Sequence, residues 1–570
     1  MLAASPHRGN RTAVKSIGAC TIGISDLDGR SEATLATDAT LAVAFAGALD
    51  NADELAARLG LGSTKAVSPA GVVLETFRTR GEKAPLLLRG TYSCVVTDGA
   101  RLWAFRDHIG LETLFYRQEA GALYVASEAK QVLRGADVSP EPEIDAVEAL
   151  FYGDLGDPSV CALRGVRRLV AATLLTADAD SLSVSPYWDP ESLLESASLS
   201  TAEAMEQFRE LLARAIGRML TGRDAVSLSG GVDSPPIAVY ANREYVRRWG
   251  HPIPALSAVY PSHTESDESR YIELVAERLG LPLHTYEPGP QRLDRLQFWL
   301  RLFDGPWSTW SPEGTAERCA QAQAHGFTTI LSGEFAEQVS ALRPFLVSHL
   351  LWRGRIGAAV GQLRSQHAAR LGRRRLLAEL TDAVTPRNVQ ARQFRRHPPA
   401  FLPSWIDLGR IGRRDAGHAL PARRRWASAQ LPFFGADPVG EADVYSHALH
   451  GIRARRPWAD VDLWEFFLSL PAEVQFPDYR AKGLARNALR GDVADEILDR
   501  RDKTYMDRWF EELGTDYPAV RRWVTTGDFR IRGVDYGRLR DELERESMPL
   551  AHYLWARDLA AVHAFVDLWS

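Results

Sequence analysis

The feature that most restricts the fold is a strand, a glycine-rich loop and a helix start in direct succession. They occupy residues 224–240, which read DAVSLSGGVDSPPIAVY. Apolar residues form the strand-like run, and Pro235 stands near the first position of the predicted helix, where proline is tolerated. The loop between them contains Ser229, Gly230, Gly231, Asp233 and Ser234. This succession is typical of an α/β fold with a parallel sheet.

The residue types of the loop favour a bound anion. Glycines let the backbone turn sharply and approach a ligand, while Ser229, Ser234 and the amides at the helix start can donate to phosphate oxygens. Asp233 fits an anion site only if a divalent cation bridges it to the phosphates, as Mg²⁺ does beside nucleotides. Because Pro235 and Pro236 have no N–H, phosphate contacts would rest on the amides before them. We therefore predict a phosphate-bearing ligand, such as a nucleotide, together with Mg²⁺.

The loop has two other interpretations. A Gly-Gly turn by itself is ordinary loop chemistry between a strand and a helix. The full hexapeptide SGGVDS after a strand is much more specific for phosphate binding. The loop lacks the Gly-Lys-Ser/Thr ending of a Walker loop, which disfavours a kinase or a motor ATPase.

The pattern of elements predicts two domains, and 570 residues are too many for one core. Short β-rich runs such as LAVAFAGAL predict an antiparallel, sheet-rich domain over residues 1–185. Strand runs that alternate with longer helices predict a doubly wound parallel sheet over residues 200–570. An Arg-rich segment interrupts the second domain at about 352–425. It is either a solvated helical insertion or a docking surface for an acidic partner or a peptide.

Composition excludes several classes of protein. A net charge of −5 argues against bulk attraction to nucleic acid. The four cysteines are scattered, without the pairing of a zinc site or a disulfide framework, which fits a reducing cytoplasm. No apolar stretch follows the basic N-terminus, and no run of roughly 18 apolar residues occurs. We expect a cytoplasmic protein with neither membrane nor nucleic acid as a partner.

Further segments, in order along the chain, resemble the asparagine-synthetase-like family of ATP-pyrophosphatases. They are RDHIGLETLFY at 106–116, ASEAK at 126–130, DGP at 304–306, LSGEFAEQ at 331–338 and the run from RPWAD to LRG at 456–491. The resemblance implies an N-terminal glutaminase-like β-sandwich with helices. It also implies a C-terminal ATP-pyrophosphatase domain of the adenine nucleotide α-hydrolase type. The family includes asparagine synthetases, β-lactam synthetases and lasso peptide cyclases.

The resemblance assigns roles to the loop and to two acids. It implies that Ser229, Gly230, Gly231, Asp233 and Ser234 hold the β- and γ-phosphates and, through Asp233, Mg²⁺. Glu337 matches a metal-binding acidic position, and Glu334 a position near the reacting carboxyl. Both acids follow a strand, at the carboxyl edge where ligands of doubly wound folds bind. The alternative is a pair of exposed loop acids. Phe335 replaces a family glycine, which would reshape the site for a bulkier substrate.

Two lysines and one aspartate complete the implied site. Lys482 and Lys503 match positions where the family uses lysines on the pyrophosphate and near the reacting centre. A compact ammonium can neutralise charge on the α-phosphate and on an oxyanion. The alternative for each is a solvated surface lysine. Asp460, in PWAD, is expected to play a structural role near a helix start.

The first domain lacks the nucleophile of a glutaminase. In the family, a cysteine at position 2 becomes residue 1 and uses its own amine as base. Leu2 stands here instead. Cys20 could be exposed only by cleavage after Ala19, and we interpret it as a small buried residue. Ala46-Gly47 replaces the Asn-Gly that helps to form an oxyanion hole. The resemblance therefore implies that the substrate carries its own amine.

Among ring-closing family members, the 456–491 run and the following DEILDRRDKT look most like lasso peptide cyclases. Such an enzyme adenylates an Asp or Glu side chain of a core peptide, and the peptide's α-amine then closes a macrolactam as AMP and pyrophosphate leave. The implied partners are a ribosomal precursor peptide, a leader peptidase and a leader-recognition protein. Two alternatives stay open: an asparagine-synthetase-like or β-lactam-synthetase-like ligase acting on a small molecule, and an inactive binding scaffold. The intact loop argues against the scaffold.

Overall fold

The computed structural model describes most of the chain. The described ranges are 1–27, 33–61, 68–153, 157–306, 312–340, 346–364, 401–411, 438–477, 480–500, 506–545 and 548–569, with residues 389, 392, 396, 398–399 and 504 described singly. Most of the predicted insertion at 352–425 lies outside these ranges, and so does Lys503. The predictions for both stay predictions.

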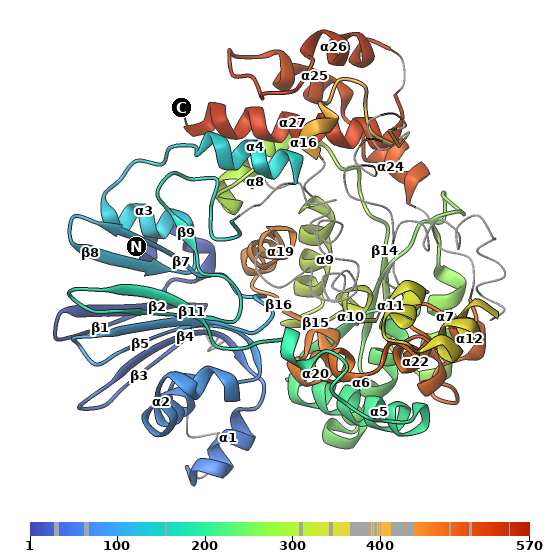
Figure 1. The fold of residues 1–570 in the computed structure, drawn as a ribbon, viewed down its shortest axis with the longest axis horizontal. Helices are drawn as coiled ribbons and strands as arrows, with labels where there is room; N and C mark the ends of the chain where they lie inside the picture. Colours follow the sequence, from blue (N-terminus) through green and yellow to red (C-terminus); the bar gives the residue numbers. More distant parts are fainter. Residues whose placement is uncertain are drawn as a thin grey trace.

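Antiparallel sheets form the N-terminal domain, at the left of Figure 1. A hairpin joins β1 (Arg11–Ile17) to β2 (Cys20–Asp26). The larger sheet has the order β11-β10-β6-β5-β4-β3, with β3 (Ala33–Thr37), β4 (Ala42–Leu49), β5 (Gly90–Thr97), β6 (Leu102–Arg106), β10 (Thr173–Ala177) and β11 (Leu182–Pro186). A third sheet has the order β8-β7-β9, with β7 (Phe115–Glu119), β8 (Ala122–Ala126) and β9 (Arg167–Arg168).

The sequence of β4 shows how this domain is layered. Residues that alternate along a strand point to opposite faces. Val43, Phe45 and Leu49 pack into a core with the helix α2 (Pro69–Arg80). The intervening positions on the other face are small alanines, which leaves room there. The other helices of the domain are α1 (Ala52–Leu59), α3 (Ala129–Ala136) and α4 (Ile144–Tyr152).

A five-stranded parallel sheet forms the centre of the C-terminal domain, in the order β14-β13-β12-β15-β16. Its strands are β12 (Asp224–Ser227), β13 (Ala255–Ala258), β14 (Leu283–Tyr286), β15 (Thr329–Leu331) and β16 (Arg453–Arg455). The helices nearest to it are α5 (Thr201–Met219), α6 (Ser234–Trp249), α7 (Ser269–Leu279), α9 (Pro312–Ala324), α10 (Ala336–Ser340), α20 (Val461–Ser469) and α22 (Gly483–Ala488). The chain is thus a two-domain α/β protein with an antiparallel and a parallel sheet.

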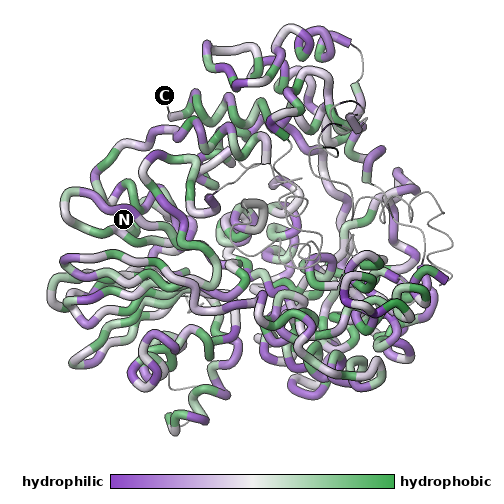
Figure 2. The backbone as a smooth tube through the Cα atoms, viewed as in Figure 1, coloured by the Kyte–Doolittle hydropathy of each residue, from purple (hydrophilic) through white to green (hydrophobic). Residues whose placement is uncertain are grey.

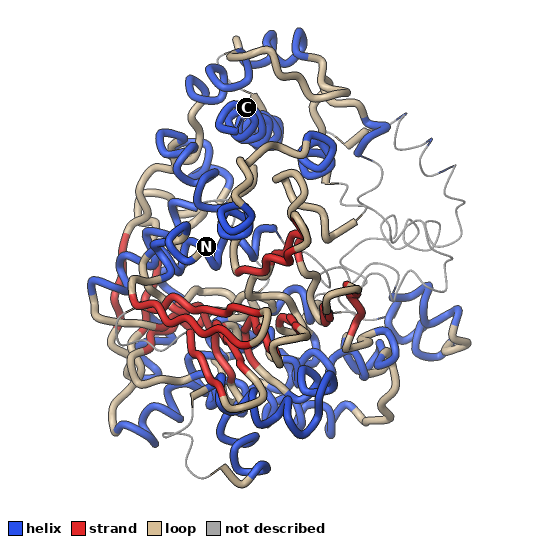
Figure 3. Tube along the Cα trace, turned by 90° about the vertical axis from the view of Figure 1, so that its left-hand side faces the viewer, coloured by secondary structure: helices blue, strands red, loops and turns tan. Residues whose placement is uncertain are grey.

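The remaining helices surround these sheets, as the blue segments of Figure 3 show. They are α8 (Leu296–Phe303), α11 (Leu346–Trp352), α12 (Ile356–Arg364), α16 (Leu408–Ile411), α19 (Pro438–Leu449), α21 (Ala472–Gln475), α23 (Asp495–Leu498), α24 (Asp507–Leu513), α25 (Tyr517–Thr525), α26 (Tyr536–Leu543) and α27 (Leu550–Trp569). In Figure 2, hydrophobic and hydrophilic residues alternate along α27. Its apolar residues share one core with Phe115 and Phe151 of the first domain. Within the described ranges, no helix combines the length and the hydrophobicity needed to cross a membrane.

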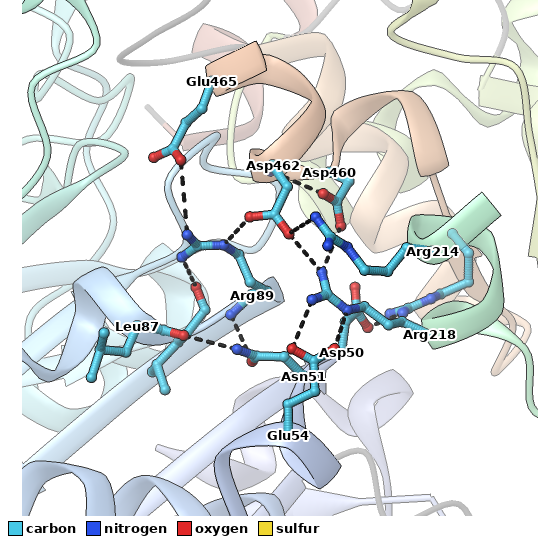
Figure 4. A network of polar contacts seen from close by, with 12 residues as sticks. Asp50, Asn51, Glu54, Leu87, Arg89, Arg214, Arg218, Asp460, Asp462 and Glu465 are labelled. Atoms are coloured by element: carbon cyan, nitrogen blue, oxygen red, sulfur yellow. Dashed lines mark hydrogen bonds and ion pairs between the residues drawn. The ribbon is translucent and has the colours of Figure 1, made fainter. Parts of the chain in front are cut away.

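Charged side chains join the two domains (Figure 4). From the first domain, Arg89 Nε lies 2.8 Å from Asp462 Oδ1 of α20. Arg218 of α5 donates to Glu54 of the first domain at 2.7 Å and to Asp462 at 2.9 Å. Asp460 lies 3.8 Å from the same Arg218. The network is largely buried. Its ion pairs connect the domain interface to the segment that contains PWAD.

Three of the quoted family segments also contribute to this interface. Lys130, in ASEAK, places its ammonium 3.1 Å from Asp304, in DGP, and 2.7 Å from Glu128. Arg106, in RDHIG, donates to Glu441 of α19 at 3.4 Å. These contacts give the segments a structural role in holding the domains together.

Candidate active site

The loop after β12 is closed by its own serines. The Ser229 N–H donates to Ser234 Oγ at 2.8 Å, and the two hydroxyl oxygens lie 3.0 Å apart. The Gly231 N–H donates to Ser229 Oγ at 3.3 Å. α6 begins directly at Ser234, with Pro235 and Pro236 in its first turn. The loop therefore lies at the N-terminal, positive end of a 16-residue helix, where an anion is stabilised.

The two loop glycines lie in a sharply bent stretch of backbone, as predicted, although neither adopts a left-handed φ. A Cβ at Gly230 would lie 2.8 Å from the Cβ atoms of Glu268 and Tyr271, so a side chain there would collide with the start of α7. A Cβ at Gly231 would meet only Ser229 Oγ, at 3.4 Å. Close packing explains Gly230, and Gly231 leaves the space beside the loop open.

The acidic side chain of Glu268, the residue just before α7, contacts the loop. The Gly230 N–H donates to Glu268 Oε2 at 2.9 Å. Arg500 donates to Glu268 Oε1 and to the Gly230 carbonyl oxygen, both at 2.7 Å. Thr504 donates to the same carboxylate at 2.6 Å. Sequence reasoning missed this cluster because Glu268 and Arg500 are one acid and one base among many. Glu268 and Arg500 are 232 residues apart in the sequence.

Three predicted site residues meet beside the loop. The Lys482 ammonium lies 2.6 Å from both carboxylate oxygens of Asp233. Glu337 lies 3.9 Å from the same ammonium and is 64% exposed. Burial raises the pKa of the Asp233 carboxyl, and the Lys482 ammonium partly opposes that rise. One carboxylate from the phosphate loop and one from the first turn of α10 thus converge on one lysine.

The loop after β15 packs directly on the phosphate loop. A Cβ at Gly333 would lie 2.8 Å from the Asp233 carbonyl carbon, so only glycine fits there. The indole N–H of Trp458 donates to the Asp233 carbonyl oxygen at 3.0 Å. This packing brings the neighbouring Glu334 to the edge of the same site. Trp458 stands in the quoted RPWAD run, which gives that tryptophan a contact with the site.

Glu334 is held by two guanidinium groups. Arg456 Nε donates to it at 2.6 Å and Arg318 at 3.3 Å. Burial alone would raise the pKa of this carboxyl, but Arg456 and Arg318 hold the pKa well below its ordinary value. A carboxylate whose pKa is held this low is a weak base, so the arrangement favours a charge-positioning role. Neither arginine was singled out from the sequence. Arg456 directly precedes the quoted PWAD and could have been tested for that reason.

Phe335 adopts a conformation that usually requires glycine. Its φ is +72°, and its side chain is only 8% exposed. The sequence comparison placed a family glycine at this position, and the backbone geometry explains why glycine suits it. The aromatic ring packs in the same core as Val339 and Trp458. Apolar burial therefore offsets the cost of a left-handed φ.

The first domain contains no nucleophile at the expected positions. Leu2 lies in a short 3₁₀ turn, Leu2–Ala4, that precedes β1. Cys20 pairs with Ile17 at the tight end of the β1–β2 hairpin and is partly exposed, which corrects our expectation that it is buried. Gly47 has a φ of +110°, and a Cβ there would lie 2.2 Å from the Thr91 carbonyl oxygen. Glycine is thus required at 47 by the backbone, while Ala46 has no polar group to stabilise an oxyanion.

Asp460 confirms the structural role expected of it. Its carboxylate accepts the Asp462 N–H at 2.9 Å and caps the N-terminus of α20. It also belongs to the buried charge network of Figure 4. Burial, and then the neighbouring Asp462, raise its pKa from the ordinary value of 3.8 to about 7. No local sequence pattern indicates this electrostatic position.

Comparison with known proteins identifies relatives for both domains. The family model for asparagine synthase matches residues 207–570, and the model for a glutamine amidotransferase domain matches residues 10–188. "Asparagine synthetase [glutamine-hydrolyzing] 3" of Bacillus subtilis is 24% identical over 481 residues, covering 81% of this chain and 73% of that protein.

Two other relatives have names other than asparagine synthetase. "Carboxyethyl-arginine beta-lactam-synthase" of Streptomyces clavuligerus is 28% identical over 218 residues, covering 38% of this chain and 40% of that protein. "Amidase chyE" of Penicillium rubens is 25% identical over 544 residues, covering 84% and 79%.

Proposed function

Because the chain belongs to the asparagine synthase family and is an ATP-dependent carbon–nitrogen ligase of that type, we propose that it is a lasso peptide cyclase. In this proposal, a side-chain carboxylate of a core peptide attacks the α-phosphorus of ATP. An acyl-adenylate forms and pyrophosphate leaves. The peptide's α-amine then attacks the acyl carbon, the bond to AMP breaks, and a macrolactam is released.

The observation that carries the proposal is an intact phosphate loop in a chain whose glutaminase-like domain lacks its nucleophile. Asp233 and Lys482 keep the charged contacts of a nucleotide site. Leu2 and Ala46 stand where a glutaminase needs a nucleophile and an amide donor. An amine that does not come from glutamine must be supplied otherwise, and an amine on the substrate itself is the simplest source.

The residues present fit a magnesium ion. Mg²⁺ commonly binds through one or two carboxylates together with substrate phosphates. Asp233 and Glu337 provide two carboxylates that meet at Lys482. When bound, the ion would neutralise charge on the phosphates. Lys482, with Lys503 as a second proposed cation, would stabilise charge that develops at the reacting centre.

Glu334 would position a cation rather than move a proton. Its carboxylate orients Arg456. The pair lies beside the phosphate loop because Gly333, next to Glu334, packs on Asp233. A fixed guanidinium is well suited to stabilise an oxyanion or a phosphate. Holding the amine and the acyl-adenylate together would accelerate ring closure mainly through orientation.

The proposed partners follow from a peptide substrate. They are a ribosomal precursor peptide, a leader peptidase and a leader-recognition protein, and the proposed location is the cytoplasm. A second candidate is a ring-closing ligase that acts on a small molecule, which the 28% identity to a β-lactam synthase over 218 residues favours. The intact loop opposes an inactive scaffold.

Mass spectrometry tests the proposal. The protein is incubated with ATP, Mg²⁺, candidate precursor peptides and the proposed leader peptidase and leader-recognition proteins. A cyclase yields a peptide lighter by one water, together with AMP. If every peptide stays linear while free aspartate or a small amino acid derivative is consumed with ATP, the small-molecule ligase is correct.

A further inference from the structure

A large cavity lies inside the first domain. Its volume is about 690 Å³, within the range of sites that hold drug-sized ligands. Ala44, Ala46 and Ala48 line it from β4, and Leu123 and Val125 line it from β8. The room exists because β4 places its large residues in the opposite core and presents alanines here. Ala46 faces Ser93 of the neighbouring strand β5 across the same surface.

The second domain closes one end of this cavity. Its lining includes Arg455 and Arg456, at the end of β16, and His447 of α19. Arg456 also donates to Glu334 at the candidate active site, at 2.6 Å. Gly333, next to Glu334, packs on Asp233. One arginine is thus shared by the cavity wall and the proposed adenylation site.

The chemistry of the wall differs between its two ends. The body of the cavity is lined by aliphatic side chains, by small polar ones such as Ser93, and by the ion pair of Arg8 and Glu112. At the end beside β16, Arg455 is 4% exposed, and within the described part of the chain its Nε has no hydrogen-bond partner. A ligand that fits this cavity has an apolar part for the aliphatic lining and a hydrogen-bond acceptor, such as a peptide carbonyl oxygen, for Arg455 Nε.

The cavity does not contain a usable glutaminase nucleophile among its described residues. Cys94 is part of its lining, but burial raises the pKa of that thiol well above its ordinary value. The thiol therefore stays protonated and unreactive. A cavity of this size with no reactive nucleophile is suited to binding rather than to hydrolysis.

We propose that this cavity receives the amine-bearing end of the peptide substrate and presents its α-amine to the acyl-adenylate beside Glu334 and Arg456. The inference rests on the proposed function. The α-amine attacks in its neutral, nucleophilic form, after its ammonium has released one proton to solvent. Its nitrogen bonds to the acyl carbon, the carbon–oxygen bond to AMP breaks, and the proton from nitrogen passes to solvent.

The test separates adenylation from amide formation. Synthetic peptides with a free α-amine and one internal Asp or Glu are screened for ATP–pyrophosphate exchange, and an active peptide is the probe. Ala46→Phe places an aromatic ring in the cavity and narrows it. Val184→Phe, on the exposed edge strand β11 of the same sheet and outside the cavity lining, is the matched control. Hydroxylamine, a nucleophile too small to need the cavity, captures the acyl-adenylate as a hydroxamate.

We expect Ala46→Phe to keep exchange and hydroxamate formation within about twofold of the wild-type protein and to lose ring closure at least tenfold. Val184→Phe keeps all three activities. Ring closure within twofold of wild type in Ala46→Phe overturns the inference. If Ala46→Phe shows no thermal unfolding transition, Ala46→Val is assayed in its place with the same two outcomes. Absence of exchange with every peptide in the wild-type protein is a different result, because it overturns the proposed function itself and this inference with it.

Discussion

Lys482 holds its ammonium nitrogen 2.6 Å from each carboxylate oxygen of Asp233, although the two residues are 249 positions apart in the chain. Asp233 stands on the loop that follows β12, and Lys482 directly precedes α22. The pair joins the phosphate loop to the C-terminal helices. It also places a cation and an acid where a magnesium nucleotide needs both.

Asp233→Ala should abolish turnover without unfolding the protein. The variant removes the proposed magnesium ligand, but the side chain is 26% exposed, so little packing is lost. We expect at least a hundredfold loss of ATP–pyrophosphate exchange and a thermal midpoint within a few degrees of wild type. Asp294→Ala, at an exposed aspartate in the same domain, is the control. Retained exchange in Asp233→Ala would refute the metal role.

Lys482→Met should change the pH dependence as well as the rate. The Lys482 ammonium lowers the pKa of Asp233 against the effect of burial, so its loss lets that pKa rise further. Asp233 then loses its proton, and becomes able to bind a cation, only at a higher pH. We expect the residual exchange activity to have its acidic limb moved to higher pH. An acidic limb that stays in place, or moves to lower pH, contradicts this electrostatic coupling.

Asp460→Asn should alter how stability depends on pH. The pKa of Asp460 is raised from 3.8 to about 7 in the folded protein. Its contribution to stability is therefore fully present below about pH 4 and is lost as the pH rises to about 7, on the order of 4 kcal/mol. Asparagine keeps the helix cap but cannot ionise.

The measurement is the thermal midpoint between pH 4 and pH 8. The wild-type midpoint should contain a component that falls over this window, and Asp460→Asn should lack it. Asp535→Asn, at an exposed cap of α26, is the matched control and should leave the wild-type profile unchanged. A variant profile that is parallel to wild type would show that Asp460 is ionised throughout.

Phe335 provides a test of the backbone at the candidate site. At an ordinary helical or extended position, glycine is less stable than alanine by about 0.5–1 kcal/mol. At the φ of +72° found here, alanine meets a steric cost that glycine avoids. We therefore expect Phe335→Gly to have a higher thermal midpoint than Phe335→Ala, although both fall below wild type through lost packing. The reverse order would contradict the left-handed φ.

Sequence reasoning predicted those parts of the protein that depend on local pattern. The strand, loop and helix around Ser229 to Ser234 follow from glycine, proline and apolar periodicity. The antiparallel first domain follows from alternating runs such as that of β4. Asp460 as a helix cap follows from its place before an apolar helical run.

The parts that were not predicted depend on contacts between distant segments. No local pattern links Glu268 to Arg500, or Glu334 to Arg456 and Arg318. The cavity behind β4 needs both domains, because Arg455 and Arg456 close it from the second one. The bend at Gly230 was predicted, but its close packing against Glu268 and Tyr271 was not, because that contact comes from a distant segment.

ATP–pyrophosphate exchange tests the central claim most directly, because it reports adenylation without requiring ring closure. The account predicts Mg²⁺-dependent exchange that is stimulated by a peptide with an internal Asp or Glu, and that persists when the peptide's α-amine is acetylated. Exchange stimulated by free aspartate but by no peptide, or no carboxylate-dependent exchange at all, would contradict it.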